Sequence, residues 1–227
     1  MAAPRTATAL FGGTFDPVHN GHIRMAIEVR ERLGIRRVVF LPARVPPHKP
    51  GQPVAEALHR LAMTDAAVAG IPGFEVSDLE IRREGPSYSI DTVSAFREKD
   101  PGTGLLFLIG ADAFAEIGTW HRYRDLLAAC DFVLLPRAGA AKTPALPPPL
   151  RLEKAVPHCY SWKGDAYRLP GGRTLYCPRL PALDIASRAI REKVREGKTI
   201  RGLVPPEVER YIAAHGLYSA SGEDERP

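Results

Sequence analysis

Residues 7–22 read ATALFGGTFDPVHNGH and combine three features in a fixed order. An apolar run, residues 7–11, stops at Gly12-Gly13, which indicates a buried strand that enters a tight turn. Asn20 is a residue type that caps helices, and the apolar spacing after it predicts a helix ending near Gly34. A second apolar run follows at 37–41. Strand, helix and strand within about 35 residues predict a βαβ unit with a right-handed crossover.

The same alternation continues along the chain. Helical spacing occurs at 56–68, 89–96 and 126–130, and short apolar runs occur at 74–76, 105–109 and 132–135. The run at 105–109 is apolar at every position, which is typical of a strand buried on both faces of a sheet. The chain is therefore expected to be an α/β protein with an open, doubly wound parallel sheet of the Rossmann-like kind.

The pattern weakens in the second half of the chain. We expect an irregular insertion at about 138–180, in which only 174–177 resembles a strand. Helices at about 186–195 and 205–215 would then form a small C-terminal helical portion. The polar tail 219–227 is expected to be flexible. Residues 1–218 are thus expected to form a single domain.

Composition narrows the class of protein. The 227 residues carry 31 basic and 26 acidic side chains, a net charge of +5 that suits small anionic substrates and is too small to argue for nucleic acid. Basic side chains near the C-terminus alternate with Glu192 and Glu196, which favours a solvated helix over RNA or DNA binding. Three cysteines without CxxC spacing indicate a reducing compartment. With no apolar run of membrane-spanning length, we expect a cytoplasmic protein without a membrane partner.

The glycine-rich turn has the features of a phosphate-binding loop. Glycines allow the backbone to approach a phosphate closely, and the N-terminus of the next helix adds a partial positive charge. His19 and His22 are three residues apart at the helix start, so their rings can converge on one pocket. The stretch lacks the lysine of a Walker loop and the three-glycine spacing of a dinucleotide-binding fingerprint.

The string Gly-Thr-Phe-Asp-Pro-x-His-x-Gly-His resembles the signature of the nucleotidylyltransferase superfamily. Along nearly its whole length the chain is similar to the bacterial nicotinate-nucleotide adenylyltransferase family. The other matching segments, in chain order, are VPPHKP (45–50), GPSYS (85–89), IGAD (109–112), TWH (119–121), DIASRAIR (184–191) and the segment 203–218. The resemblance implies a nucleotidylyltransferase fold.

The resemblance also implies a reaction. The phosphate of nicotinate mononucleotide would attack the α-phosphorus of ATP, giving deamido-NAD and pyrophosphate in NAD biosynthesis. ATP and nicotinate mononucleotide would be the partners, and a homo-oligomer is possible. Mg²⁺ would arrive with ATP, since it shields the β and γ oxygens of the leaving group. No cluster of residues resembles a dedicated metal site.

Site residues follow from the matching segments. The implied catalytic residues are His22 and His19. The implied ATP-binding residues are Gly12, Gly13, Thr14, Phe15, His19, His22, Gly110, Asp112, Ile185, Ser187, Arg188 and Arg191. The implied acceptor-binding residues are Thr14, His48, Lys49, Tyr88, Ser89, Thr119 and Trp120. Trp120 would stack on the nicotinate ring, although it can also be interpreted as a core aromatic residue.

One segment departs from the family pattern. The usual Ile-Ser-Ser/Ala-Thr-x-Ile-Arg becomes IASRAIR at 185–191, and the loss of two hydroxyls is expected to weaken ATP binding. Arg188 can be interpreted as a replacement contact to phosphate or as a solvated partner of Glu192. Two alternatives remain open: another acceptor or nucleotide, such as phosphopantetheine or CTP, and a nucleotide-binding regulator that has lost turnover.

Overall fold

A computed structural model of the chain describes residues 7–47, 53–136, 146–148, 150–155, 164–181 and 183–219. In these residues eight strands form one sheet in the order β3-β2-β1-β4-β5-β8-β7-β6. The strands are β1 (Ala7–Gly13), β2 (Arg37–Pro42), β3 (Phe74–Val76), β4 (Gly104–Gly110), β5 (Asp131–Leu135), β6 (Glu153–Lys154), β7 (Asp165–Arg168) and β8 (Thr174–Cys177). All adjacent pairs are parallel except those that β7 makes with β6 and β8.

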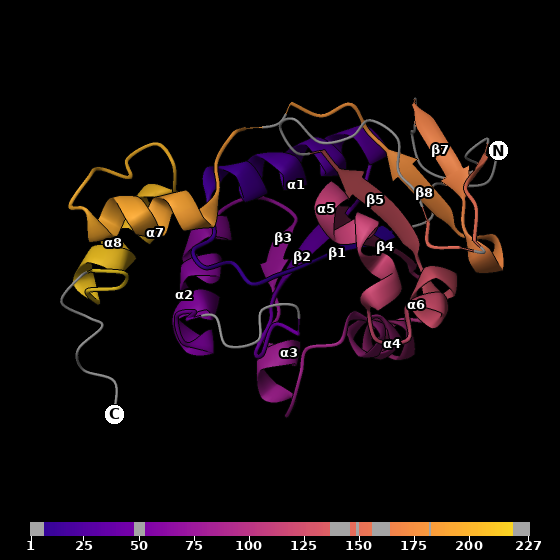
Figure 1. Ribbon diagram of the computed structural model, residues 1–227, viewed down its shortest axis with the longest axis horizontal. Coiled ribbons are helices and arrows are strands. Elements are labelled where there is room, and N and C mark those ends of the chain that lie inside the picture. Colours follow the sequence, from indigo (N-terminus) through magenta and orange to yellow (C-terminus); the bar gives the residue numbers. More distant parts are fainter. Residues whose placement is uncertain are drawn as a thin grey trace.

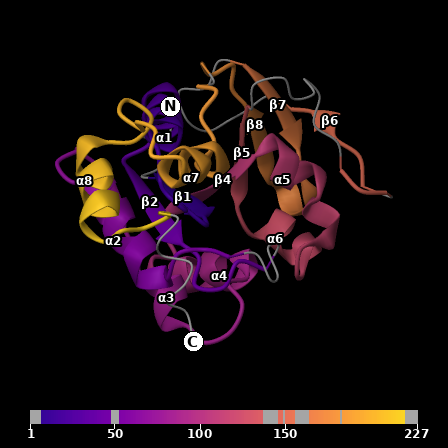
Figure 2. The same cartoon turned by 60° about the vertical axis from the view of Figure 1, so that its left-hand side comes forward.

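Helices cover both faces of this sheet (Figure 1). The helices are α1 (Asn20–Leu33), α2 (Ala57–Val68), α3 (Leu79–Arg82), α4 (Ser89–Lys99), α5 (Ala111–Ala115), α6 (Tyr123–Ala129), α7 (Ser187–Arg195) and α8 (Pro206–Ala214), with 3-10 turns η1 (Ile117–Thr119) and η2 (Pro170–Gly172). Buried residues of α1, α2, α7 and α8 pack on one face, and those of α4, α5 and α6 pack on the other. Figure 2 shows α8 beside α2, where the two helices are in contact. Among the described helices, none has both the length and the apolar composition that would allow it to cross a membrane.

The two faces follow from the alternation of side chains along each strand. In β1, Ala9 and Phe11 belong to the core under α1, whereas Leu10 belongs to the core under α4. Across the β1–β4 pair, Leu10 lies opposite Phe107. A strand with apolar residues on both faces can only be stable between two helical layers. The expected α/β class with a doubly wound sheet is confirmed.

The order in which strands are added to the sheet changes side between β1 and β4, which are parallel neighbours. From β1 the chain proceeds to β2 and β3 on one side, and the later strands β4 and β5 lie on the other side. In open α/β sheets this change of side opens a crevice at the carboxyl ends of the strands, where ligands bind. Here those ends are Gly13 of β1 and Gly110 of β4.

The insertion is more regular than its sequence indicated. Three of the eight strands, β6, β7 and β8, fall within or close to the expected irregular segment at 138–180 and extend the sheet beyond β5. β7 pairs antiparallel with β8, so the sheet is mixed rather than fully parallel. The sequence did not reveal β6 and β7, because these short strands are mostly exposed and lack an apolar run.

The buried face of α2 also differs from expectation. The helical spacing at 56–68 rests on apolar residues that include Leu58, but Leu58 is 66% exposed. The residues that face inward are Arg60, Met63, Thr64, Ala67 and Val68. They repeat at intervals of three and four, so they form a regular helical stripe. A charged residue at the start of this stripe obscured it in the sequence.

Removal of side-chain volume from the central strand is expected to destabilise the fold. Leu106 of β4 is fully buried between the two helical layers. Leu106→Ala should lower the free energy of unfolding by about 3 kcal/mol, since it leaves a cavity in a packed core. Urea denaturation measures this change. Leu58→Ala on exposed α2 surface is the matched control and should change stability by less than about 0.5 kcal/mol; equal losses for the two variants would contradict this description of the core.

Candidate active site

The loop after β1 is anchored by a buried aromatic ring. Phe15 has a left-handed backbone, with φ of 49°, and its side chain is buried. Its ring lies edge-on to the ring of His22, with 5.1 Å between centroids. A Cβ atom at Gly13 would lie only 2.9 Å from this ring, so glycine is needed there. Because the Phe15 side chain belongs to the core, its predicted ATP contact can involve only its backbone.

Two histidines cap the helix that follows the loop. His19 is the N-cap of α1, and its Nδ1 accepts a hydrogen bond from the His22 backbone N–H at 3.4 Å. The His22 Nδ1 accepts in return from the His19 backbone N–H at 3.2 Å. The rings are stacked with centroids 3.6 Å apart, so the two imidazoles lie together at the helix start. Their predicted convergence on a nucleotide pocket stays a prediction. The assignment of the cap to Asn20 was wrong, because Asn20 is already helical and its side chain donates to the Gly202 carbonyl.

This reciprocal cap fixes the tautomer of both rings. An Nδ1 that accepts a hydrogen bond carries no proton, so each neutral imidazole carries its proton on Nε2. Burial lowers the pKa of His19 from its ordinary 6.5 to about 4, so this ring is neutral at neutral pH. The neutral His19 ring therefore has one N–H donor, on Nε2, and lies at the positive end of the α1 dipole. Its contact with phosphate stays a prediction.

Two predicted ATP-binding residues of α7 are hydrogen-bonded to the backbone of the phosphate loop. The Ser187 hydroxyl donates to the Pro17 carbonyl at 2.9 Å, and Arg191 donates to the Asp16 carbonyl at 2.7 Å. Ile185 lies beside the start of α1, with its Cβ 3.7 Å from the position of a Cβ added at Gly21. The structure thus brings these three residues to the phosphate loop, and their contact with ATP stays a prediction.

Arg188 is exposed to solvent and paired with Glu192, which is the second of its two interpretations. Its side chain is 84% exposed, and its Nε donates to Glu192 at 2.8 Å. Ala186 is the N-cap of α7 and supplies no side-chain hydrogen bond, as expected from the missing hydroxyl. A phosphate contact from Arg188 stays a prediction.

Two further predicted ATP-binding residues lie at the end of β4. Gly110 is the last residue of β4 and the N-cap of α5, and Asp112 lies in the first turn of that helix. Both are exposed at the carboxyl edge of the sheet, next to the strand that carries the phosphate loop. Their contact with nucleotide stays a prediction.

Five of the predicted acceptor-binding residues line one cavity. The cavity has a volume of about 550 Å³, and its walls include Thr14, Tyr88, Ser89, Thr119 and Trp120. Gly12 and Gly13 also line it, so the cavity begins at the phosphate loop. The predicted residues His48 and Lys49 lie outside the described part of the chain.

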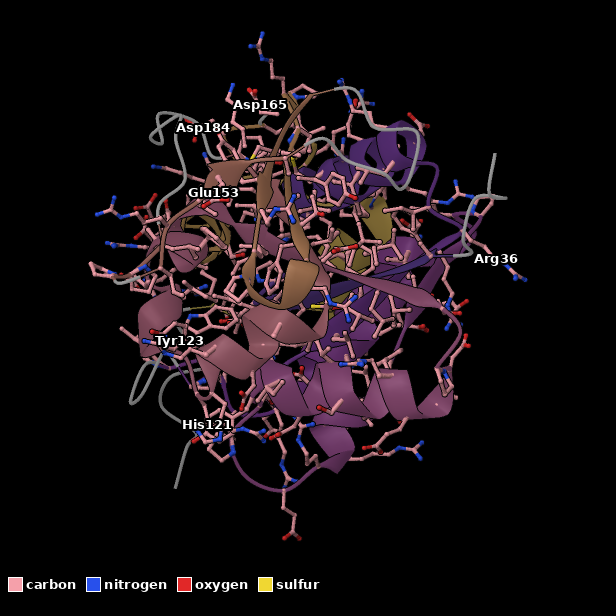
Figure 3. All side chains as sticks on the ribbon, turned by 90° about the vertical axis from the view of Figure 1, so that its right-hand side faces the viewer. Arg36, His121, Tyr123, Glu153, Asp165 and Asp184 are labelled. Atoms are coloured by element: carbon pink, nitrogen blue, oxygen red, sulfur yellow. The ribbon has the colours of Figure 1, made fainter. Side chains whose placement is uncertain are left out.

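Aromatic side chains form two walls of this cavity. Tyr88 is stacked on His121, with 4.2 Å between ring centroids and 27° between ring planes. Trp120 is half-buried and lies edge-on to Phe107 at 6.3 Å, so it has both a core contact and a cavity-lining surface. In Figure 3, His121 and Tyr123 lie on the left side of the molecule, below Asp165 of β7, which lies near the top.

Sequence reasoning missed three residues with buried polar groups at this site. The Asp16 carboxylate accepts hydrogen bonds from the Tyr218 hydroxyl at 2.7 Å and the Ala55 N–H at 3.2 Å. Glu80 lines the cavity, accepts from Thr92 at 2.7 Å, and has its pKa raised by burial. Arg60 is almost fully buried on α2. Asp16 had a usable signal, since it lies within the stretch 7–22, whereas Arg60 had none, because its carbonyl partners come from other segments of the chain.

The buried His19 makes stability depend on pH. Its pKa is lower in the folded chain than in the unfolded chain, so the unfolded state binds more protons between pH 6.5 and about 4. Stability is fully present above pH 6.5 and falls as the pH drops through this window. His19→Asn keeps a capping side chain but cannot titrate. From pH 7 to pH 4.5, the wild type should lose roughly 2–3 kcal/mol more than the variant in urea unfolding; parallel losses would contradict a neutral, buried His19.

Comparisons with known proteins agree with this geometry. The model of the cytidylyltransferase-like family matches residues 10–193. A protein of Trichlorobacter lovleyi named probable nicotinate-nucleotide adenylyltransferase is 41% identical over 211 residues, 92% of this chain and 97% of that protein. A protein of Geobacter sulfurreducens with the same name is 41% identical over 217 residues, 95% of this chain and 99% of that protein.

A solved structure has the same fold. The nicotinic acid mononucleotide adenylyltransferase of Plasmodium falciparum, complexed with NaAD, superposes with a TM-score of 0.68 and covers 94% of this chain and 97% of its own. Its sequence identity is 17%, so this likeness bears on the fold alone. The family-model match and the identity to full-length relatives go further: the chain belongs to the cytidylyltransferase-like family and, within it, to the nicotinate-nucleotide adenylyltransferases.

Proposed function

We propose that this chain transfers the adenylyl group of ATP to nicotinate mononucleotide, forming deamido-NAD and pyrophosphate in NAD biosynthesis. One observation carries the proposal: the phosphate loop opens directly into an aromatic-lined cavity. Gly12, Gly13 and Thr14 belong to both, so a nucleotide on the histidine side and an acceptor in the cavity would meet at this loop. Membership in the nicotinate-nucleotide adenylyltransferase family supports the same reaction.

The chemistry requires placement and charge neutralisation rather than a covalent intermediate. A phosphate oxygen of nicotinate mononucleotide attacks the α-phosphorus, and the bond to the bridging oxygen breaks as pyrophosphate leaves. The Nε2–H groups of His19 and His22 would donate to phosphate oxygens, with His22 at the α-phosphoryl group where charge increases. The N-terminus of α1 adds its dipole to the same anion.

On the acceptor side, the cavity suits a flat aromatic ring. Tyr88 and Trp120 would contact the faces of the nicotinate ring, since stacking between aromatic rings is favourable. Backbone N–H groups near Thr119 would bind its carboxylate. The rival acceptor phosphopantetheine has no ring for these walls, and the cavity therefore favours nicotinate mononucleotide.

Mg²⁺ is proposed to enter with ATP. Among the described residues, no group of three or more His, Cys, Asp or Glu side chains is placed to hold a metal. The phosphate oxygens and water would therefore hold the ion, and it would shield the charge of the leaving pyrophosphate.

We also propose that the protein does not bind nucleic acid and that it is cytoplasmic. These two proposals rest on its surface charge and its free thiols. On α7 and the turn after it, Arg188 is paired with Glu192 and Lys198 with Glu196, so this surface does not present a continuous basic stripe for nucleic acid. Cys130 and Cys177 are free thiols, which suits the cytoplasm. A homo-oligomer stays a prediction.

A catalytically weakened regulator is the second candidate, motivated by the missing cap hydroxyl at Ala186. Pyrophosphate release from ATP plus nicotinate mononucleotide separates the candidates. Release with this acceptor supports the proposed enzyme, and release with another acceptor or with CTP supports a sister transferase. Tight ATP binding without release for any acceptor supports the regulator.

Loss of the His22 imidazole should reduce turnover strongly. His22→Ala removes a donor to the developing charge, and the expected fall in kcat is about 100-fold or more. Steady-state pyrophosphate release measures it, with circular dichroism as the check on folding. His59→Ala is the matched control, because His59 on α2 contacts Tyr211 of α8 instead of the phosphate loop. Near-normal kcat for His22→Ala would remove His22 from the mechanism.

Loss of the Trp120 ring should affect the acceptor alone. Trp120→Ala is expected to raise the KM for nicotinate mononucleotide about tenfold, on the scale of one aromatic stacking contact. The KM for ATP should stay within about twofold, since the nucleotide is expected to bind on the other side of the loop. Trp120→Phe keeps a flat ring and should restore most of the acceptor affinity. A rise in both KM values would contradict the assignment of the cavity.

A further inference from the structure

Arg60 is a buried cation with an unusual set of partners. It is 1% exposed, and it is the largest of the fully buried side chains in the described residues. Its Nε donates to the Ala55 carbonyl at 2.8 Å, and its two terminal nitrogens donate to the carbonyls of Thr14 at 2.8 Å and Arg44 at 3.1 Å. A buried guanidinium is costly to desolvate, and three charge-assisted hydrogen bonds to backbone carbonyls offset this cost. Such a group fixes the positions of the segments that it binds.

The three carbonyls belong to three different segments around the reaction centre. Thr14 is in the phosphate loop and lines the acceptor cavity. Arg44 follows Ala43, which also lines the cavity, and the Arg44 N–H donates to the Ser87 hydroxyl at 2.9 Å. Ala55 leads into α2. One side chain thus ties the phosphate loop to the cavity wall.

Ala55 links Arg60 to Asp16 of the phosphate loop through its two backbone groups. Its N–H donates to the Asp16 carboxylate at 3.2 Å, while its carbonyl accepts from Arg60. The Asp16 carboxylate acts electrostatically on Arg60 and offsets part of the cost of burying the cation, although burial still lowers the pKa of Arg60. The guanidinium is a rigid planar fork with donors on three nitrogens, whereas a lysine ammonium carries its donors on one freely rotating nitrogen.

We propose that Arg60 is a positioning residue that holds the phosphate loop at a fixed separation from the acceptor wall. This inference rests on the proposed function, because alignment matters only if two substrates react across Thr14. Arg60 touches neither the histidines nor the aromatic walls in any hydrogen bond described here, so each substrate would still bind when Arg60 is replaced. The loss would appear in the alignment of the two reacting groups, that is, in kcat.

The test compares two buried substitutions on the same helix. Arg60→Lys keeps the charge and loses the three-way geometry; it should lower kcat about 30-fold, the scale of a misplacement near 1 Å, while both KM values stay within about threefold. Met63→Ala is the matched control, because Met63 is fully buried one turn away and belongs to the core. It should lower the thermal midpoint at least as much as Arg60→Lys and leave kcat within about threefold of the wild type. If Arg60→Lys does not fold, Arg60→Gln takes its place with the same expected outcome.

A second readout does not depend on turnover. Hydrogen–deuterium exchange should become faster in peptides that cover 12–16 and 43–47 of the Arg60 variant and stay unchanged in β4 and β5. Unchanged kcat, an equal fall in kcat for Met63→Ala, or exchange that rises evenly along the chain would overturn the proposal. If the wild type itself forms no deamido-NAD, the proposed function fails, and the exchange result alone decides whether Arg60 holds the loop.

Discussion

The reciprocal cap between His19 and His22 is the contact around which the site is built. A helix N-terminus has unsatisfied N–H groups, and most helices satisfy them with a short hydroxyl or carboxylate side chain. Here two imidazoles do so with their Nδ1 atoms. The cap therefore leaves each neutral ring with its proton on Nε2, the tautomer that can donate to phosphate, at the positive end of the same helix. In both rings Nδ1 thus caps the helix, and Nε2 is the atom proposed to bind phosphate.

Distant segments of the chain keep this cap and its loop in place. Ser187 and Arg191 bind the backbone at Pro17 and Asp16, and Tyr218 binds the Asp16 side chain. The Asn20 backbone N–H donates to the Leu203 carbonyl at 2.9 Å. The C-terminal helices therefore act on the site through the loop. We propose that they support nucleotide binding by holding this loop in place.

The sequence predicted the parts of the structure that have local signals. The βαβ unit, the buried strands and the glycine turn follow from hydrophobic period and turn chemistry. Five residues that the family resemblance implied for acceptor binding line one cavity, and their contact with an acceptor stays a prediction. The parts that it missed depend on tertiary contacts. A charged residue such as Arg60 looks solvated in a sequence, because its buried carbonyl partners come from three other segments. Likewise, Asn20 is the better cap by residue type, yet the chain turns one residue earlier and His19 takes that place.

The central claim is that the two capped imidazoles bind the triphosphate at the carboxyl edge of the sheet. A crystal structure of the chain with a non-hydrolysable ATP analogue tests it most directly. We expect phosphate oxygens within hydrogen-bond distance of Nε2 of both His19 and His22. The adenosine should lie outside the aromatic cavity. A triphosphate bound elsewhere, with both imidazoles making no contact to it, would contradict the account.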